Sequence, residues 1–280
     1  MSFPFRTDIA AEAFRALDAA QSPGLAFEEK IVDGFSVSRL TVTGAEGEKR
    51  LGKPAGRYNS VRLDKLLHRG AALFPSAAAV VSDEIRRLLP KDYASVTVVG
   101  LGNPDITPDA LGSLAASSIF ATRHLRDKGP SDFASLRAVS VLRPGVLGTS
   151  GIESSVQIGA VCAEIKPEAV IVIDALAAAE PASLCRTVQI SDTGIIPGSG
   201  VGNDRAAVNA AALGVPVISI GAATVIDAGT LCGDAAVEKM FVTPRSIDFD
   251  VRMIGRLIGY AVDLALHDGL TVDDIDALIG

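Results

Sequence analysis

Short runs of apolar, largely β-branched residues recur through the second part of the chain. The runs are four to six residues long, and Gly or Asp ends or follows most of them. Strands that are apolar at nearly every position are buried on both faces, as in a parallel sheet covered by helices on each side. The pattern predicts strands at residues 96–100, 136–141, 169–173, 187–190 and 215–220.

Helical patterns lie between several of these runs. Residues 108–124 begin with a proline, which suits the first turn of a helix, and a threonine precedes them as a cap. Residues 154–164 and 204–213 are similar, and Gly214 stands where a glycine commonly ends a helix. Residues 247–267 have apolar positions at helical spacing and predict a long helix packed on the sheet. This alternation predicts an α/β fold of three layers, with a mostly parallel sheet and helices on both faces.

The first 90 residues have a different pattern. Residues 25–32 and 35–43 alternate around Asp33-Gly34, and an Asp-Gly pair between such runs is a strong hairpin signal. A helix capped by a threonine or aspartate is expected over residues 8–20. Residues 64–89 carry two helical patterns that are broken at a proline. This part of the chain is therefore expected to form a peripheral hairpin with helices.

The sequence has no clear linker, repeat or low-complexity tract. It predicts one α/β domain over residues 1–280, in which residues 1–90 are the peripheral part and residues 91–280 form the core sheet. No run of about 18 apolar residues occurs, so no helix that spans a membrane is expected. The first five residues do not have the basic and apolar regions of a signal peptide.

Composition and charge narrow the class of protein. Hydrophobic residues make up 48% of the chain, which is too many for a disordered protein. With 26 basic and 33 acidic residues the net charge is −7, which argues against a general nucleic-acid binder. The three cysteines, Cys162, Cys185 and Cys232, are widely spaced. They fit a reducing cytoplasm and exclude a disulfide scaffold or a paired-cysteine zinc site.

Two aspartates stand where strands of the expected sheet end. Asp174 directly follows one strand, and Asp109 begins the segment after another. Each has an ordinary structural explanation, because Asp174 can cap a helix and Asp109 can compensate a helix dipole. The sharper hypothesis is that both meet in the crevice beyond the strand ends, where repulsion keeps one carboxyl protonated and the other ionised. Such a pair can activate a water and protonate a leaving amine, as peptide hydrolysis requires.

Four further residues are weaker candidates for the same site. Asn103 follows the first strand of the core and can polarise a substrate carbonyl together with nearby backbone amides. Asp8 is either a helix cap or another acid of the site. Asp192 opens an Asp-Thr-Gly triplet like that of pepsin-like proteases, which have an all-β fold. His124 is expected late in a helix as a partner of its dipole, with a metal site shared with aspartates as the alternative.

No motif indicates a cofactor. Gly100-Leu101-Gly102 lacks the third glycine of a dinucleotide-binding loop. The glycine-rich segment 198–202 is not followed by the Lys and Ser or Thr of a phosphate-binding loop, although it can form an anion nest. We therefore expect neither a nucleotide nor a resident metal.

Several short motifs follow one another along the chain. They include Arg6-Thr7-Asp8-Ile9-Ala10, Gly52-Lys53-Pro54, Thr107-Pro108-Asp109-Ala110-Leu111-Gly112, Thr122-Arg123-His124-Leu125, Ile173-Asp174-Ala175-Leu176-Ala177, Gln189-Ile190-Ser191-Asp192-Thr193-Gly194 and Pro197-Gly198-Ser199-Gly200-Val201-Gly202-Asn203. Taken together and in order, these motifs resemble those of the germination protease, or spore protease, of endospore-forming bacteria. The resemblance extends from about residue 6 to 267 and is far more specific than any single motif.

This resemblance implies a cytoplasmic endopeptidase of the spore core that degrades small acid-soluble spore proteins during germination. It also implies a phosphorylase/hydrolase-like fold, related to hydrogenase maturation proteases, and a homotetramer made as a zymogen. The family is classed as atypical aspartic proteases, and its two proposed catalytic aspartates fall on Asp109 and Asp174. The short stretch before Arg6 departs from the family pattern, so N-terminal activation is not expected to follow the usual route.

Two alternatives remain open from the sequence. One is a metal-dependent maturation-type protease of the same fold, with metal near Asp109, Asp174 and His124. The other is a non-catalytic protein that binds spore proteins without cleaving them. Small acid-soluble spore proteins are the expected partners in either case, with no direct contact to nucleic acid or membrane.

Overall fold

The structure is a computed structural model and describes residues 7–17, 23–128, 133, 135–199, 205–237 and 240–279. Within these residues one continuous sheet runs in the order β1-β2-β3-β7-β8-β6-β4-β5, with β9 beside β8. The strands are β1 (Leu25–Val32), β2 (Phe35–Val42), β3 (Gly56–Arg62), β4 (Ser95–Gly100), β5 (Ala138–Leu142), β6 (Ala169–Ala178), β7 (Thr187–Ser191), β8 (Val217–Asp227) and β9 (Phe241–Val242).

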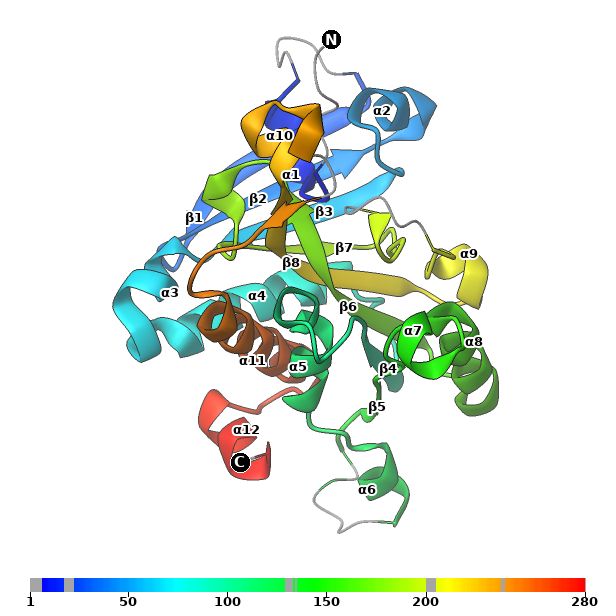
Figure 1. The fold of residues 1–280 in the computed structure, drawn as a ribbon. Coiled ribbons are helices and arrows are strands. Elements are labelled where there is room, and N and C mark those ends of the chain that lie inside the picture. The colour runs from blue at the N-terminus through cyan, green and yellow to red at the C-terminus, as the bar shows by residue number, and fades with distance from the viewer. Residues whose placement is uncertain are drawn as a thin grey trace.

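The helices lie before, between and after these strands (Figure 1). They are α1 (Ala10–Arg15), α2 (Gly44–Leu51), α3 (Asp64–Arg69), α4 (Phe74–Leu88), α5 (Leu111–Ser117), α6 (Arg123–Lys128), α7 (Leu147–Ser150), α8 (Ser154–Ile165), α9 (Ala210–Leu213), α10 (Ala228–Cys232), α11 (Ile247–Leu266) and α12 (Val272–Ile279). None of the helices that the structure describes is long and apolar enough to cross a membrane.

The α/β class with helices on both faces of the sheet is confirmed. The sheet itself is mixed rather than mostly parallel, because only the part β8-β6-β4-β5 is parallel. Strand β7 lies antiparallel to β8 and to β3. The connection from Ala178 to Thr187 explains this direction, since a parallel crossover needs about a dozen residues or more.

The N-terminal hairpin extends this sheet instead of standing apart from it. Strands β1 and β2 pair along their whole length around Asp33 and Gly34, whose φ angles of 48° and 85° suit a two-residue hairpin turn. Strand β2 pairs with β3, and β3 with β7, so one sheet runs through both predicted parts of the chain. The pattern of the sequence did not predict β3, because its central residues Asn59 and Ser60 are polar although both are buried.

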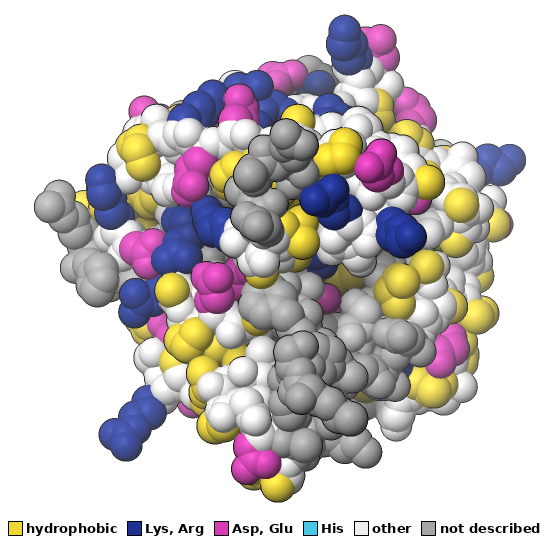
Figure 2. Space-filling view, turned by 90° about the horizontal axis from the view of Figure 1, so that it is seen from above, with side chains coloured by type: hydrophobic (Ala, Val, Ile, Leu, Met, Phe, Trp, Pro, Cys, Tyr) yellow, Lys and Arg dark blue, Asp and Glu magenta, His cyan; other side chains and the backbone are white. Residues whose placement is uncertain are grey.

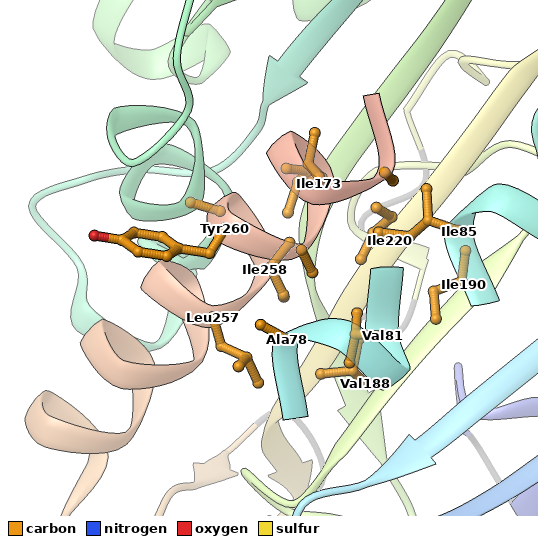
Figure 3. Close-up of a cluster of buried hydrophobic side chains, with 14 of the residues drawn as sticks. Ala78, Val81, Ile85, Ile173, Val188, Ile190, Ile220, Leu257, Ile258 and Tyr260 are labelled. Atoms are coloured by element: carbon orange, nitrogen blue, oxygen red, sulfur yellow. The ribbon is translucent and has the colours of Figure 1, made fainter. Parts of the chain in front are cut away.

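Apolar side chains cover both faces of the sheet. On one face, α4 and α11 pack against β6, β7 and β8 (Figure 3). Val81 of α4 and Ile258 of α11 are fully buried there, together with Ile173 of β6. On the other face, Ile158 of α8 packs against Val172 of β6. Successive residues of β6 thus face opposite layers, which makes the strand buried along almost its whole length.

Three predicted helices are shorter than expected. The helix expected over residues 8–20 is helical only over Ala10–Arg15 within the described residues. The segment 108–124 divides into a 3₁₀ turn (Thr107–Asp109), α5 and the start of α6. The chain leaves the helical path after α5, where the main-chain N–H of Phe120 donates to the carboxyl of Asp263 in α11 at 3.0 Å. The Thr107 hydroxyl does not cap the helix but donates to Asp248 at 2.8 Å.

The predicted helix over 204–213 begins only at Ala210, because Asn209 accepts the capping hydrogen bond from Ala212. Gly214 ends it in the left-handed conformation, as predicted. Much of the glycine-rich segment, residues 200–204, lies outside the described residues, as do residues 18–20 of the predicted first helix. Helices α8 and α11 agree with the predicted ranges to within a residue.

Candidate active site

A cavity of about 370 Å³ opens beyond the carboxyl end of β4, beside the second half of β6. Ligands of such sheets commonly bind at this end of the parallel strands. The ionisable side chains that line the cavity, among the described residues, are Asp8, Asp109, Asp174 and Arg205. They come from four segments that are far apart in the sequence.

Asp174 lies in β6, directly beyond the last residue that pairs with β4. Its side chain is 5% exposed, and its carboxyl accepts the N–H of Ala175 at 3.0 Å. Burial raises the pKa of Asp174 to about 8, with the negative charges of Asp109 and Asp8 adding to the effect. The Ala175 N–H and the Arg205 charge oppose this shift. At neutral pH the Asp174 carboxyl is therefore predominantly protonated.

Asp109 ends the 3₁₀ turn that follows β4. Its carboxyl accepts the main-chain N–H of Asn103 at 2.7 Å. Burial raises the pKa of Asp109, while that N–H and the charge of Arg205 lower it. The two carboxyls thus have different surroundings, because Asp109 is less buried and only the pKa of Asp174 is raised further by neighbouring carboxylates.

Two glycines allow this turn to lie close against the sheet. Gly102 has a φ angle of 94°, and a Cβ atom there would collide with the main-chain oxygen of Asp109. A Cβ atom on Gly112, in the first turn of α5, would collide with the carbonyl oxygen of Ile173. The position of Asp109 beside Asp174 therefore depends on residues without side chains.

Replacing Gly102 by alanine is expected to displace Asp109 and lower the cleavage rate by at least roughly tenfold, because misplacing a reacting group costs this much or more. The matched control is Gly148→Ala, because a Cβ atom at Gly148 meets nothing within 4 Å. Initial rates and thermal melting of both variants check this prediction. A Gly102→Ala enzyme with wild-type activity would contradict the role that we give to the turn.

Asp8 approaches the cavity from the N-terminal segment. Its N–H donates to Ala177 O at 2.9 Å, and its carboxyl accepts the Ala177 N–H at 2.8 Å. Gln189 donates to the carbonyl of Asp8 at 2.9 Å, and the Ser199 hydroxyl donates to its carboxyl at 3.4 Å. These bonds hold Asp8 against Ala177, near the carboxyl end of β6 and a few residues beyond Asp174. It is a wall residue of the site rather than a helix cap, since α1 begins at Ala10 without a side-chain cap.

Of the other three sequence candidates, Asn103 takes part only through its main chain, and Asp192 and His124 lie elsewhere. Asn103 contributes its main-chain N–H to Asp109, whereas its side chain accepts the N–H of Asp105 at 3.0 Å. Asp192 forms an ion pair with Arg57 at 2.7 Å and lines a different cavity. His124 is exposed on α6, near the amino ends of the strands, where Arg126 of the same helix donates to Ala94 just before β4.

Arg205 was not predicted from the sequence. It lies in irregular chain between the glycine-rich segment and α9. The sequence contains one weak signal for it, because Arg205 is a basic residue shortly after a glycine-rich segment that follows a strand. Without the fold this signal does not place Arg205 in the site. In the structure it is the cation of a cavity that otherwise holds three acids.

No cluster of three or more His, Cys, Asp and Glu side chains arranged for a metal ion occurs in the described part of the chain. The three acids of the cavity are accompanied by a cation instead of by a further ligand. His124, the ligand named in the metal-dependent alternative, does not line this cavity.

Taken together, the fold and the cavity define an α/β protein with two carboxyls of unequal proton affinity at the ends of parallel strands. Comparison with known sequences identifies the family of this protein. The family model described as germination protease matches residues 7–241. The chain belongs to the germination protease family, and it is accordingly a protease, an enzyme of the hydrolase class.

The curated relatives agree with this assignment. A germination protease from Caldanaerobacter subterraneus subsp. tengcongensis is 37% identical, with 98% of each chain covered. One from Geobacillus sp. is 38% identical over 91% of this chain and 69% of its own. Among solved structures, a [NiFe] hydrogenase maturation protease, HycI from Thermococcus kodakarensis KOD1, matches 65% of this chain and 98% of its own. Its TM-score of 0.38 and identity of 17% are too low to bear on fold or activity.

Proposed function

We propose that this protein is an aspartic-type endopeptidase that degrades small acid-soluble spore proteins during germination, with Asp109 and Asp174 as its catalytic pair. The observation that carries the proposal is the burial of Asp174 beside Asp109 in one cavity, which separates their proton affinities. Membership of the germination protease family supports the substrate class and the setting.

The two carboxyls divide the work of acid and base. Asp109, ionised, takes a proton from the attacking water, whose oxygen bonds to the scissile carbonyl carbon while the π electron pair moves to the carbonyl oxygen. The electron pair on the oxygen then re-forms the C=O bond as the C–N bond breaks. The nitrogen departs with the electrons of the C–N bond and takes the proton of Asp174. A proton passes from Asp109 to Asp174 to restore the starting state. Asp174 begins in the protonated form that its burial favours.

The charge of the chain is consistent with a protease whose substrates, and not the enzyme, bind DNA. The net charge is −7, and acidic, basic and apolar side chains are mixed on the face seen in Figure 2. We place the enzyme in the cytoplasm of the spore core and propose that it is a homotetramer formed from a zymogen, as the family resemblance implies.

The direct test is incubation of the purified chain with a purified small acid-soluble spore protein, followed by mass analysis of the products. We expect a small set of defined fragments, with the same rate in the presence of a chelator. Binding without any fragments would identify a sheltering protein, and loss of cleavage with chelator would identify a metal-dependent protease. Either result would overturn this proposal.

The rate is expected to depend on pH on both sides of an optimum. The alkaline side falls near pH 8, because Asp174 loses the proton that it donates. The acid side falls above the pH at which an ordinary aspartate titrates, because burial raises the pKa of Asp109 as well. Initial rates measured from about pH 4 to about pH 10 check this shape. A flat rate through pH 8 would contradict the role of Asp174 as the acid.

A further inference from the structure

We propose that Arg205 is a further catalytic residue, whose guanidinium binds the oxyanion formed when water adds to the scissile carbonyl. This inference rests on the proposed function and adds to it the group that receives the negative charge. The two-carboxyl mechanism above places a full charge on the carbonyl oxygen while Asp174 keeps its proton for the leaving amine. Such an oxygen needs a donor or cation already in place.

Arg205 has its guanidinium available for this purpose. Its main-chain N–H donates to Pro197 O at 3.3 Å, which holds the backbone of the residue. Within the residues that the structure describes, its side chain forms neither a hydrogen bond nor an ion pair. A guanidinium presents five N–H donors in one plane and remains charged at any working pH.

The position of Arg205 relates it to both reacting carboxyls at once. It lines the same cavity as Asp109 and Asp174. Its charge lowers the pKa of each of them, against the larger effect of burial. A charge that acts on both carboxyls is also near a carbonyl held between them, because these interactions weaken with distance.

Four of the donors beside the carboxyls are already engaged, whereas the Thr224 hydroxyl, which also lines the cavity, has no partner among the described residues but carries no charge. The Asn103 N–H binds Asp109, the Ala175 N–H binds Asp174, and the Ala177 N–H binds Asp8. The Ser199 hydroxyl also donates to Asp8. These groups stabilise the acids before any substrate arrives, so they are not free to receive a new negative charge.

The walls of the cavity increase the effect of a fixed cation. Ile106, Leu176 and Phe241 line it together with other apolar residues. In such surroundings a charge interacts more strongly than in water. As Asp109 takes the proton of the water, its negative charge passes to the carbonyl oxygen, so the number of negative charges near Arg205 is the same before and after the step. The guanidinium therefore needs little reorganisation during the reaction.

An arginine in such a cavity can also recognise an acidic side chain of the substrate. That role predicts a different result, since it affects only substrates that carry the acid. An oxyanion forms on every substrate, whatever its side chains. The test therefore uses two peptides of one sequence from the spore protein, with either Glu or Gln at each acidic position around the cleaved bond.

We expect Arg205→Gln to lower kcat by roughly 10²- to 10³-fold on both peptides with little change in KM, the range found when one oxyanion donor is removed. Arg205→Lys is expected to retain part of the activity, because it keeps the charge but not the planar fork. The pH profile of Arg205→Gln shifts to higher pH, because removing the cation raises the pKa of both carboxyls. Arg205→Lys leaves the profile near that of the wild type.

The matched control is Arg252→Gln, an exposed arginine on α11 outside the cavity, which is expected to keep wild-type rates. Thermal melting shows whether each variant is folded. A loss confined to the Glu peptide, and expressed in KM, would overturn the oxyanion role in favour of side-chain recognition. Wild-type kcat in Arg205→Gln, with Asp109→Asn and Asp174→Asn inactive, would overturn the inference and leave the proposed function standing.

Discussion

Replacing Asp174 by asparagine is expected to reduce cleavage by roughly 10²- to 10⁴-fold while making the folded protein more stable. The activity falls because asparagine has no acidic proton to give to the leaving amine. The fold is retained because the amide oxygen can still accept the Ala175 N–H, which lies at 3.0 Å in the wild type. Its NH₂ group would face Asp109 in the same cavity.

The gain in stability follows from the proton affinity of Asp174. Its native carboxyl keeps its proton up to about pH 8, whereas the same group in the unfolded chain releases it near 3.8. The native state therefore binds more protons across this interval, and the free energy of unfolding falls as the pH rises through it, by up to about 1.4 kcal/mol for each unit. Asparagine does not titrate, so the free energy of unfolding of Asp174→Asn does not fall for this reason as the pH rises.

The difference in stability should thus depend on pH. Thermal or denaturant unfolding at pH 4 is expected to show little difference between wild type and Asp174→Asn. At pH 7 the variant is expected to be more stable by at least about 1 kcal/mol, which is a few degrees in Tm. A variant that is less stable than the wild type at pH 7 would contradict the account of Asp174 as a buried, protonated acid.

Asp263 supplies the control for this experiment. Its carboxyl is fully buried in α11, and burial raises its pKa to about 8 as well. It accepts the N–H of Phe120 and does not line the catalytic cavity. Asp263→Asn is therefore expected to gain stability at neutral pH and to cleave at the wild-type rate. The pair of variants separates an effect of stability from an effect on chemistry.

Replacing Asp109 by asparagine is expected to lower cleavage by a similar factor of roughly 10²- to 10⁴-fold, for the opposite reason. The variant lacks the base that accepts the proton of the attacking water. The amide oxygen can still accept the Asn103 N–H, whose bond to Asp109 is 2.7 Å long in the wild type, so the turn should persist.

Asp109→Asn also has a measurable effect on its neighbour. Removing the negative charge of Asp109 lowers the pKa of Asp174, because repulsion between the two carboxyls contributes to its high value. The residual activity should accordingly decline at lower pH than in the wild type. Full activity in Asp109→Asn, measured on the spore protein by mass analysis, would exclude the mechanism.

The sequence predicted the parts of this site that lie on strands. The apolar run 169–173 predicted a buried strand, with Asp174 directly after its end. In the structure β6 continues to Ala178, and Asp174 lies where the pairing of β6 with β4 ends. The same argument placed Asp109 near the end of β4. The structure brings both to one cavity, while their catalytic roles stay a proposal.

The parts that the sequence did not predict depend on contacts between distant segments. Asp8 belongs to the site through bonds to Ala177 and Gln189, and no local pattern shows such pairings. Strand β3 was not predicted because its polar Asn59 breaks the apolar pattern that is typical of a buried strand. In the structure Asn59 is buried and donates a hydrogen bond to Glu84 of α4 at 2.9 Å. Arg205 lies in irregular chain, where hydrophobic periodicity carries no information.

The central claim is that one proton is shared unequally by two carboxyls, with Asp174 holding it at neutral pH. It is tested most directly by titrating the side-chain carboxyl carbons of ¹³C-labelled aspartate by NMR, with the Asp174 signal identified by its absence from Asp174→Asn. The account predicts a midpoint for Asp174 near pH 8 that moves lower in Asp109→Asn. A midpoint near the ordinary value of 3.8, unchanged in Asp109→Asn, would contradict it.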